Sequence, residues 1–286
     1  MLPSRALGDR LVRPIGLGAM PLSSRKRPSE ADALAVLDAA LDAGIDLIDT
    51  ADVYCINNGD LGHNERLIAA CLRRRSARVL VATKGGLRRP RGAWTSAAHP
   101  DQLKAACEAS LRALASERID LYQLHAPDDT VPLADSVGAL AELQAAGKIA
   151  AIGLSNVSVA EIELARSIVP IVSVQNRFNP LDPSPITDGV LDWCTRNGVG
   201  FLAYSPVGGS EEYALIGRHP ALIEVGRRIG ASPYQVALAW LLACSPVVIP
   251  IPGASKLSSV HSSAAVMDME LSASDKVFLD HAFLPG

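Results

Sequence analysis

Four side chains with suitable chemistry for reducing a carbonyl group stand at, or just beyond, the ends of apolar segments. They are Asp49, Tyr54, Lys84 and His125. Hydride attack on a carbonyl produces an alkoxide, which a phenol with a reference pKa of about 10 can protonate. A lysine cation beside Tyr54 would favour the phenolate and ease proton donation, and Asp49 would hold that lysine charged and oriented. His125 could donate a hydrogen bond to the carbonyl oxygen as negative charge develops there.

Each of these residues also has a purely structural interpretation. Asp49 and Lys84 could form an ordinary buried ion pair, His125 could be a hydrogen-bonded core residue, and Tyr54 could be a loop aromatic. The joint pattern favours chemistry, because all four positions fall at the same end of successive units of the chain. Whether they act together therefore depends on a fold that gathers those ends.

Eight strand-like apolar runs predict such a fold. The runs are continuous rather than alternating, which is typical of parallel strands covered by helices. In a parallel barrel, the carboxyl ends of all strands open on one face, where groups distant in sequence meet. The runs are Pro14–Met20, Ile45–Ile48, Val79–Thr83, Ile119–Leu124, Ile149–Leu154, Ile171–Val174, Gly200–Ala203 and Val247–Pro250.

The segments between these runs have helical periodicity, with leucine or cysteine at every third or fourth place of Asp101–Ala115. Ser29, Ser158 and Ser232 begin sequences that resemble capping boxes. We therefore expect an α/β fold, a single (β/α)8 TIM barrel domain over residues 1–286. The main competitor, an open doubly wound sheet, usually carries a GxGxxG turn after its first strand, and residues 16–21 do not supply one.

Composition excludes several functional classes. A net charge of −3 and the lack of a basic stripe argue against nucleic acid as a partner. The apolar stretches are too short to span a membrane. The five cysteines are scattered, without a CxxC pair or a Cys/His cluster, so we expect no metal site and a cytoplasmic protein with reduced thiols.

Two long stretches without a strand or helix signal, Gly85–Pro100 and Ser205–His219, are expected on the active face. Loops of such length in a compact domain are usually functional. Trp94 in the first could line the substrate pocket, while the nearby arginines are interpreted as a solvated basic loop. Gly208 and Gly209 in the second would let the backbone approach a phosphate closely.

Over nearly its whole length, the chain resembles the aldo-keto reductase superfamily. The resemblance rests on the segments Asp49-Thr50-Ala51-x-x-Tyr54, Gly153-Leu154-Ser155-Asn156, Gln175-Asn176 and Tyr204-Ser205-Pro206. It implies that Asp49, Tyr54, Lys84 and His125 form the catalytic tetrad, with the tyrosine as proton donor. One departure is Cys55, which stands where the family often has glycine.

The resemblance also implies a nicotinamide cofactor, NADPH, bound without a Rossmann turn. Asn156 and Gln175, with Ser155, would hydrogen-bond its carboxamide, Tyr204 would stack on its ring, and the segment after Tyr204 would pass over the pyrophosphate. Alternatively, the amides cap strand ends and Tyr204 belongs to the core. The implied cofactor positions are Ala19, Met20, Ser155, Asn156, Gln175, Tyr204, Ser205, Pro206, Val207, Gly253, Ser255, Lys256, Ser259 and Ser263.

The adenosine end departs furthest from the family pattern. Ser259 stands where many relatives have arginine or histidine for the 2′-phosphate, and Ser262-Ser263 replaces a common Glu-Asn pair. Lys256 is the remaining cation in this segment that could meet the phosphate, so we expect NADPH to be preferred over NADH by a reduced margin. If Lys256 points into water instead, the protein would use either cofactor.

Together these features predict reversible, NAD(P)H-dependent reduction of a small aldehyde or ketone by a monomer or weak homo-oligomer. A cofactor-binding regulatory subunit or sensor with little turnover is the alternative. A third class, a barrel lyase or isomerase unrelated to this superfamily, would need no nicotinamide.

Overall fold

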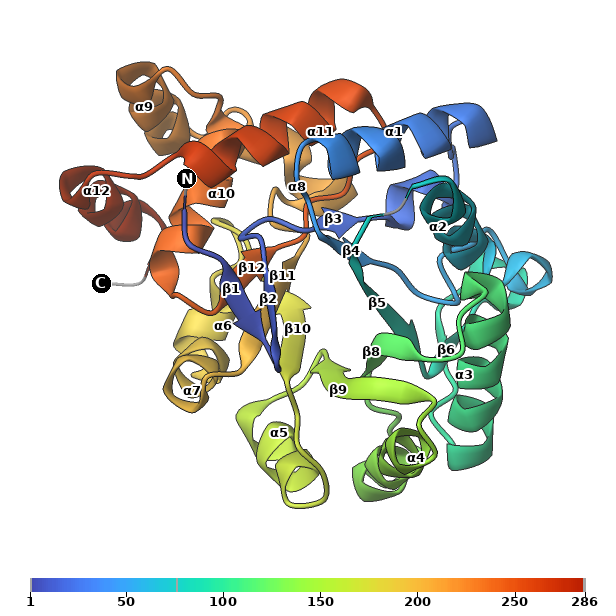
Figure 1. The fold of residues 1–286 in the computed structure, drawn as a ribbon. Helices are drawn as coiled ribbons and strands as arrows, with labels where there is room; N and C mark the ends of the chain where they lie inside the picture. Colours follow the sequence, from blue (N-terminus) through green and yellow to red (C-terminus); the bar gives the residue numbers. More distant parts are fainter. Residues whose placement is uncertain (1, 76, 285–286) are drawn as a thin grey trace.

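The predicted barrel is present. The computed structural model describes residues 2–75 and 77–284, and eight parallel strands follow one another around a single sheet (Figure 1). In order they are β3 (Leu17–Gly18), β4 (Leu47–Asp49), β5 (Leu80–Gly85), β8 (Ile119–Leu124), β9 (Ile149–Ser155), β10 (Ser173–Arg177), β11 (Gly200–Tyr204) and β12 (Val248–Pro250). Of the 286 positions assigned to the predicted domain, 1, 76, 285 and 286 lie outside the described residues.

The first and last strands close the barrel through backbone hydrogen bonds. The N–H of Gly16 donates to the Pro250 carbonyl oxygen, and that of Gly18 to Pro252, both at 3.0 Å. A Cβ atom at position 18 would lie 2.7 Å from the Ile251 carbonyl oxygen. Glycine at this position is therefore what lets the two strands approach each other.

The predicted strands occur in the right order, but some of their bounds were wrong. Of Pro14–Met20, only Leu17–Gly18 is a strand, because the chain turns into a 3-10 helix, η1, at Met20–Leu22. Conversely, β10 continues past Val174 to Arg177 and pairs residue by residue with β11. The predicted strand ended too early because the residues after Val174 are polar, but the backbone hydrogen bonds between strands do not require apolar side chains.

Helices surround the barrel (Figure 1). Ser158 and Ser232 form complete capping boxes, and Ser29 accepts a hydrogen bond from the Asp32 N–H, which confirms the three predicted helix starts. The helices are α1 (Glu30–Asp42), α2 (His63–Arg74), α3 (Pro100–Leu114), α4 (Leu133–Ala145), α5 (Val159–Arg166), α6 (Ser184–Thr187), α7 (Val190–Asn197), α8 (Gly209–Ile216), α9 (Pro220–Ile229), α10 (Pro233–Cys244), α11 (Leu257–Ala264) and α12 (Ala273–Phe283), with short 3-10 helices η2 (Asn58–Asp60), η3 (Pro90–Gly92) and η4 (Ala265–Asp268).

An amino-terminal hairpin, which the sequence analysis missed, packs against the barrel interior. Its strands are β1 (Arg5–Leu7) and β2 (Arg10–Val12), and it lies across the barrel opening in Figure 1. Leu7 and Val12 are buried in one apolar cluster with side chains of the barrel strands, including Leu47. Three-residue strands are too short to show a periodic signal, so only packing reveals this element.

The two stretches expected to be irregular contain regular structure. In the first, β6 (Leu87–Arg88) and β7 (Thr95–Ser96) form an antiparallel hairpin. The second includes helix α8, and this part of the prediction was wrong. Tertiary contacts hold α8: Glu212 accepts a hydrogen bond from Arg177 at 2.7 Å, and Tyr213 stacks on Tyr234 with ring centroids 4.1 Å apart.

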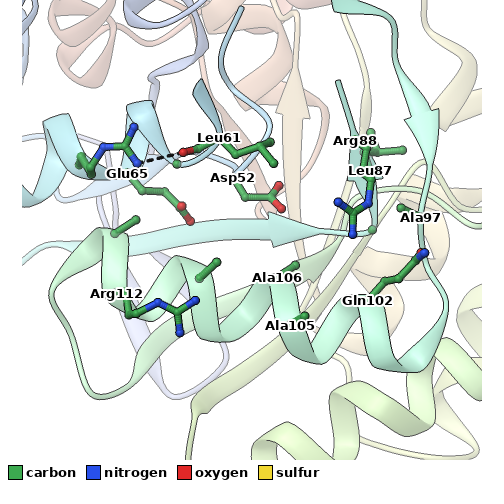
Figure 2. A pocket seen from close by; sticks show the side chains of 15 residues that line it. Asp52, Leu61, Glu65, Leu87, Arg88, Ala97, Gln102, Ala105, Ala106 and Arg112 are labelled. Atoms are coloured by element: carbon green, nitrogen blue, oxygen red, sulfur yellow. Dashed lines mark hydrogen bonds between the residues drawn. The ribbon is translucent and has the colours of Figure 1, made fainter. Parts of the chain in front are cut away.

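Two global features complete the fold. Within the described residues, no helix combines the length and apolarity needed to cross a membrane. A cavity of about 500 Å³ opens between α2, α3 and the segment after β5, and Asp52 and Glu65 are among the residues lining it (Figure 2).

Candidate active site

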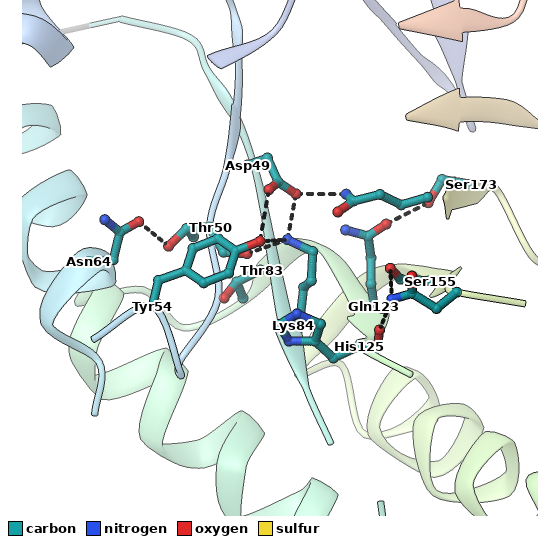
Figure 3. Close-up of polar contacts among 12 residues, drawn as sticks. Asp49, Thr50, Tyr54, Asn64, Thr83, Lys84, Gln123, His125, Ser155 and Ser173 are labelled. Carbon is teal, nitrogen blue, oxygen red and sulfur yellow. Dashed lines mark hydrogen bonds and ion pairs between the residues drawn. The ribbon is translucent and has the colours of Figure 1, made fainter. Parts of the chain in front are cut away.

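Lys84 is the centre of a buried polar network at the carboxyl end of the barrel (Figure 3). Its side chain is 0% exposed. Nζ donates to Asp49 Oδ1 at 2.7 Å, to the Thr50 carbonyl oxygen at 2.8 Å and to the Tyr54 phenol oxygen at 3.0 Å. These partners occupy all three donors of the ammonium group. Burial lowers the pKa of Lys84, and the adjacent Asp49 carboxylate opposes this by favouring the charged form.

Asp49, the last residue of β4, links two sides of the barrel. Its Oδ1 accepts hydrogen bonds from Lys84 and from Nε2 of Gln175, the latter at 2.8 Å, and its Oδ2 lies 3.5 Å from the Tyr54 hydroxyl. Gln175 belongs to β10, which is four strands away from β4 in the sheet order. The carboxylate is thus held in one orientation by groups from three strands or their ends.

Tyr54 is almost completely buried beside this pair. Burial, and second the Asp49 carboxylate, raise the pKa of Tyr54 well above its usual range. Burial and the Asp49 carboxylate thus outweigh the effect expected of the neighbouring lysine, which would favour the phenolate. Tyr54 consequently keeps its proton at neutral pH, as a proton donor must. The hydrogen bond from Lys84 would stabilise the phenolate that remains after the proton has left.

His125 follows β8 and completes the predicted tetrad. Its ring lies edge-on to the rings of Tyr54 and Trp94, each with centroids 5.9 Å apart. Burial, and second the charge of Lys84, lower the pKa of His125 well below its usual value, so the imidazole is neutral. Among the described residues, nothing hydrogen-bonds to its buried Nδ1. The ring therefore retains a buried hydrogen-bonding atom that no described residue uses.

Further polar residues that the sequence analysis missed hold the loop after β4. The hydroxyl of Thr50 donates to Asn64 Oδ1 at 2.6 Å, and Asn64 Nδ2 donates to the Ala19 carbonyl oxygen at 2.8 Å. Thr83 donates to Glu65 Oε1 at 2.6 Å. Asn64 and Glu65 are fully buried in the first turn of α2. Their signal in the sequence is a pair of polar residues on the apolar face of an amphipathic helix.

The residues predicted to bind the nicotinamide lie together beside the tetrad. Asn156 has a left-handed backbone, with φ of 59°. Its Nδ2 donates to the His125 carbonyl oxygen at 2.9 Å and to Ser155 Oγ at 3.1 Å, and its Oδ1 accepts from the Tyr204 hydroxyl at 2.8 Å. Gln175 contacts Asp49, as described above. These contacts hold the side chains of Asn156 and Gln175 in place. That these residues bind a cofactor stays a prediction.

The segment after Tyr204 has an unusual backbone. Ser205, Gly208 and Gly209 all have positive φ, at 49°, 85° and 59°. Pro206 is buried, and the half-buried Val207 packs against the core. In the described structure, no side chain caps the amino end of α8, which begins here. Its first backbone N–H groups are therefore suitable donors for an anionic ligand.

The expected adenosine end surrounds the amino terminus of α11. Gly253 forms a parallel bridge with Gly18, next to the buried Ala19 and the exposed Met20. Lys256 is exposed and is the N-cap residue of α11, which has no side-chain cap within the described chain. The predicted serines nearby are the exposed Ser255 and the half-buried Ser259 and Ser263.

The β6–β7 hairpin places an aromatic side chain beside the tetrad. Trp94 is 49% exposed and lies against His125, in agreement with the expectation that it lines the substrate side. The Arg89 guanidinium stacks over the Trp94 ring, 3.9 Å from its centroid. This arginine is thus not simply solvated, whereas Arg91 is exposed.

Comparison with known proteins agrees with this architecture. The model of the Aldo/keto reductase family matches residues 14–281. The chain is 33% identical to uncharacterized oxidoreductase C215.11c of Schizosaccharomyces pombe, covering 93% of this chain and 85% of that protein. It is 31% identical to aldo-keto reductase str7 of Strobilurus tenacellus, covering 100% and 94% respectively.

Among solved structures, an aldo/keto reductase from Klebsiella pneumoniae in complex with NADP and acetate superposes with a TM-score of 0.86. It is 26% identical, and the match covers 100% of this chain and 97% of that chain. The barrel and these relatives define an oxidoreductase. The chain belongs to the aldo/keto reductase family.

Proposed function

We propose that this protein reduces a small aldehyde or ketone to the corresponding alcohol, reversibly, with NADPH as cofactor and Tyr54 as proton donor. The proposal rests on one observation above all. A single buried ammonium group, Lys84 Nζ, contacts both the Tyr54 phenol and the Asp49 carboxylate, at 3.0 Å and 2.7 Å. The NADP found in the Klebsiella pneumoniae relative supports the choice of cofactor.

The described residues fit a dinucleotide. Serines cap α1, α5, α10 and α12, whereas α8 and α11 are among the helices that begin without a side-chain cap in the described structure. Free backbone donors at two helix amino ends suit phosphate groups. When bound, the cofactor supplies the hydride. The residues that would hold it are Ala19, Met20, Ser155, Asn156, Gln175, Tyr204, Ser205, Pro206, Val207, Gly253, Ser255, Lys256, Ser259 and Ser263.

The reaction needs a proton at the carbonyl oxygen, and Tyr54 donates it. The raised pKa of Tyr54 keeps the phenol protonated until that oxygen becomes basic. The N–H of Lys84, which already points at the phenol oxygen, then stabilises the phenolate, and Asp49 balances the lysine charge. In alcohol oxidation the same groups act in the opposite direction, with the Tyr54 phenolate accepting the proton.

His125 orients the carbonyl. Because burial lowers the pKa of His125 well below its usual value, the ring is neutral and carries one N–H. A neutral imidazole can donate a hydrogen bond to the carbonyl oxygen without itself being the acid. Trp94, edge-on to His125, closes one side of the substrate space.

The experiment is a panel of aldehydes and ketones, with NADPH oxidation followed by absorbance. Turnover of an aromatic aldehyde is the expected result. NADPH binding without turnover of any carbonyl would favour the regulatory or sensor role. No quenching of protein fluorescence by NADPH would instead point to lyase or isomerase chemistry.

Cofactor preference provides a specific prediction. NADPH is expected to have a higher kcat/KM than NADH, and Lys256→Ala is expected to shrink that ratio. Lysine is a flexible point charge, without the planar fork by which arginine grips phosphate, so discrimination is modest. Lys276→Ala, on α12, is the matched control. A preference for NADH, or an unchanged ratio in Lys256→Ala, would show that Lys256 does not read the 2′-phosphate.

The segment 205–219 is expected to be the most mobile part of the active face without cofactor and to become protected when NADPH binds. Its positive-φ residues and uncapped helix start support the proposal that the pyrophosphate lies against this segment. Hydrogen exchange measured with and without saturating NADPH tests this. Equal exchange in both conditions contradicts the prediction, and the amides of β8 serve as an internal reference.

We further propose that the protein acts in the cytoplasm as a monomer or weak homo-oligomer, without nucleic-acid or membrane partners. All five cysteines, each within the described part of the chain, are free thiols. Burial raises the pKa of Cys107 and Cys194 to about 12, so both behave as inert core side chains. Gel filtration at several protein concentrations tests the oligomeric state.

A further inference from the structure

The cavity between α2 and α3 is separate from the proposed reaction site and has a polar interior of its own (Figure 2). Its volume is about 500 Å³. Alanines of α3 provide much of one wall, which explains the space. The residues that matter here are the carboxylic acids Asp52 and Glu65, Ala109 of α3, and the arginines Arg66, Arg88 and Arg112.

Both carboxyl groups have an unused oxygen. Asp52 is 7% exposed and Glu65 is 0% exposed, and in Figure 2 both side chains point into the cavity. Glu65 Oε1 accepts a hydrogen bond from Thr83. Among the described residues, nothing donates in full hydrogen-bond geometry to Asp52 Oδ1 or Glu65 Oε2, and the Ser110 hydroxyl is the polar group beside Glu65. A buried carboxylate without a partner is energetically unfavourable, so a ligand that donates to these oxygens would be stabilised.

The pKa values of the two acids reflect their buried surroundings. Burial is the main cause that raises the pKa of both Asp52 and Glu65, and for Asp52 the nearby Glu65 is the second cause. Hydrogen bonding to Thr83 and to the buried Ser110 hydroxyl opposes this effect at Glu65, whereas the buried Tyr122 hydroxyl has no hydrogen-bond partner in the described structure. Nothing in the catalytic proposal uses any of these four groups.

The cavity's chemistry favours an organic ammonium group over a metal ion. The described residues contain no cluster of three or more His, Cys, Asp or Glu side chains that could hold a metal. An ammonium group carries three N–H donors, which suits two neighbouring carboxyl groups that line one cavity. Charge-assisted hydrogen bonds of this kind are short and strong.

Positive charge on both sides of the acids narrows the class of ligand. Arg88 and Arg112 are exposed and lie at opposite ends of the cavity in Figure 2. Arg66 donates to the Leu61 carbonyl oxygen at 2.9 Å, which fixes it at the rim. These arginines repel a simple cation, but they attract a molecule that carries an anionic group beside its ammonium group.

We propose that this cavity binds a small zwitterion. Its ammonium group lies between Asp52 and Glu65, its carboxylate or phosphate pairs with Arg88 or Arg112, and its apolar middle section packs on the alanines of α3. This binding site goes beyond the proposed carbonyl reduction and does not depend on it.

The position of Asp52 decides how the site must be tested. Its N–H lies 3.5 Å from the Lys84 carbonyl oxygen and its own carbonyl oxygen accepts from the Gly62 N–H at 2.7 Å. It also lies between Asp49 and Tyr54 in the chain. A change at Asp52 would disturb the tetrad, so the informative variant fills the cavity from α3 instead.

Isothermal titration calorimetry of the full chain with 4-aminobutanoate, 6-aminohexanoate, hexylamine and hexanoate tests the proposal. At least one amino acid of the two is expected to bind, and hexylamine about tenfold or more weakly, since a hydrogen bond to a charged group contributes that much. Hexanoate is expected not to bind. Ala109→Phe should abolish the signal, while Ala160→Phe, at an exposed alanine of α5, should retain it.

Several outcomes would overturn the proposal. They are no binding by either amino acid, equal binding by hexylamine, and undiminished binding in Ala109→Phe. If Mg²⁺ gives a heat of binding and prevents the amino acid from binding, the cavity is a metal site instead. If Ala109→Phe does not fold, as judged by thermal unfolding, the double variant Arg88→Gln/Arg112→Gln replaces it and should bring the amino acid to the affinity of hexylamine.

Discussion

Replacing Tyr54 by phenylalanine is expected to lower kcat for carbonyl reduction by about 10²–10⁴-fold, the range that general acid–base groups typically supply. The substitution removes the donated proton but keeps the aromatic ring, which packs at 5.9 Å from His125. The affinity for NADPH should therefore stay close to that of the wild type. Steady-state reduction of an aromatic aldehyde and a fluorescence titration with NADPH measure the two quantities separately.

The control is Tyr234→Phe, which removes a hydroxyl from α10 but keeps the ring that stacks on Tyr213. It should leave kcat within a factor of about two, as surface changes usually do. A loss of less than about tenfold in Tyr54→Phe would contradict the assigned role. A parallel loss of NADPH affinity would show that the ring, rather than the proton, is what matters.

Replacing Lys84 by methionine is expected to abolish most activity and also to destabilise the fold. Methionine preserves much of the side-chain volume but leaves Tyr54 without its hydrogen-bond donor and the buried Asp49 without its cation. Breaking a buried ion pair by removing one partner typically lowers the free energy of unfolding by about 3–5 kcal/mol. Urea unfolding and kcat for aldehyde reduction measure the two effects.

The double variant Asp49→Asn/Lys84→Met separates the two consequences. Without the unpaired carboxylate, it should recover part of the lost stability, because the amide of asparagine can be buried with hydrogen bonds from Gln175. Activity should not return, since the phenolate of Tyr54 would still have no cation beside it. Recovery of activity in the double variant would refute the role of Lys84 in proton transfer.

The order of the strands and the residues at their ends could be predicted from the sequence. Continuous apolar runs reflect strands buried on both faces, and a parallel barrel necessarily places their carboxyl ends on one side. Lys84 and Asp49 are therefore expected near each other from the sequence. The helix starts at Ser158 and Ser232 were predictable for a local reason, because a capping box involves only four consecutive residues.

Features that depend on contacts between distant segments were not predictable. The hydrogen bond between Gln175 and Asp49 joins residues 126 positions apart. Helix α8 begins at paired glycines that resemble a loop, and contacts of Glu212 and Tyr213 with other parts of the chain hold it. The amino-terminal hairpin is visible only where Leu7 packs against the barrel.

The type of fold and the four groups of the expected tetrad could be predicted because both follow from local patterns repeated along the chain. The electrostatics of the site, in contrast, depend on how the whole chain packs. Burial is the leading cause of the raised pKa of Tyr54 and of the lowered pKa of His125, and burial depends on every segment packed around a side chain. For the same reason, the unpaired oxygens of Asp52 and Glu65 emerged only once α2, α3 and the segment after β5 were in place.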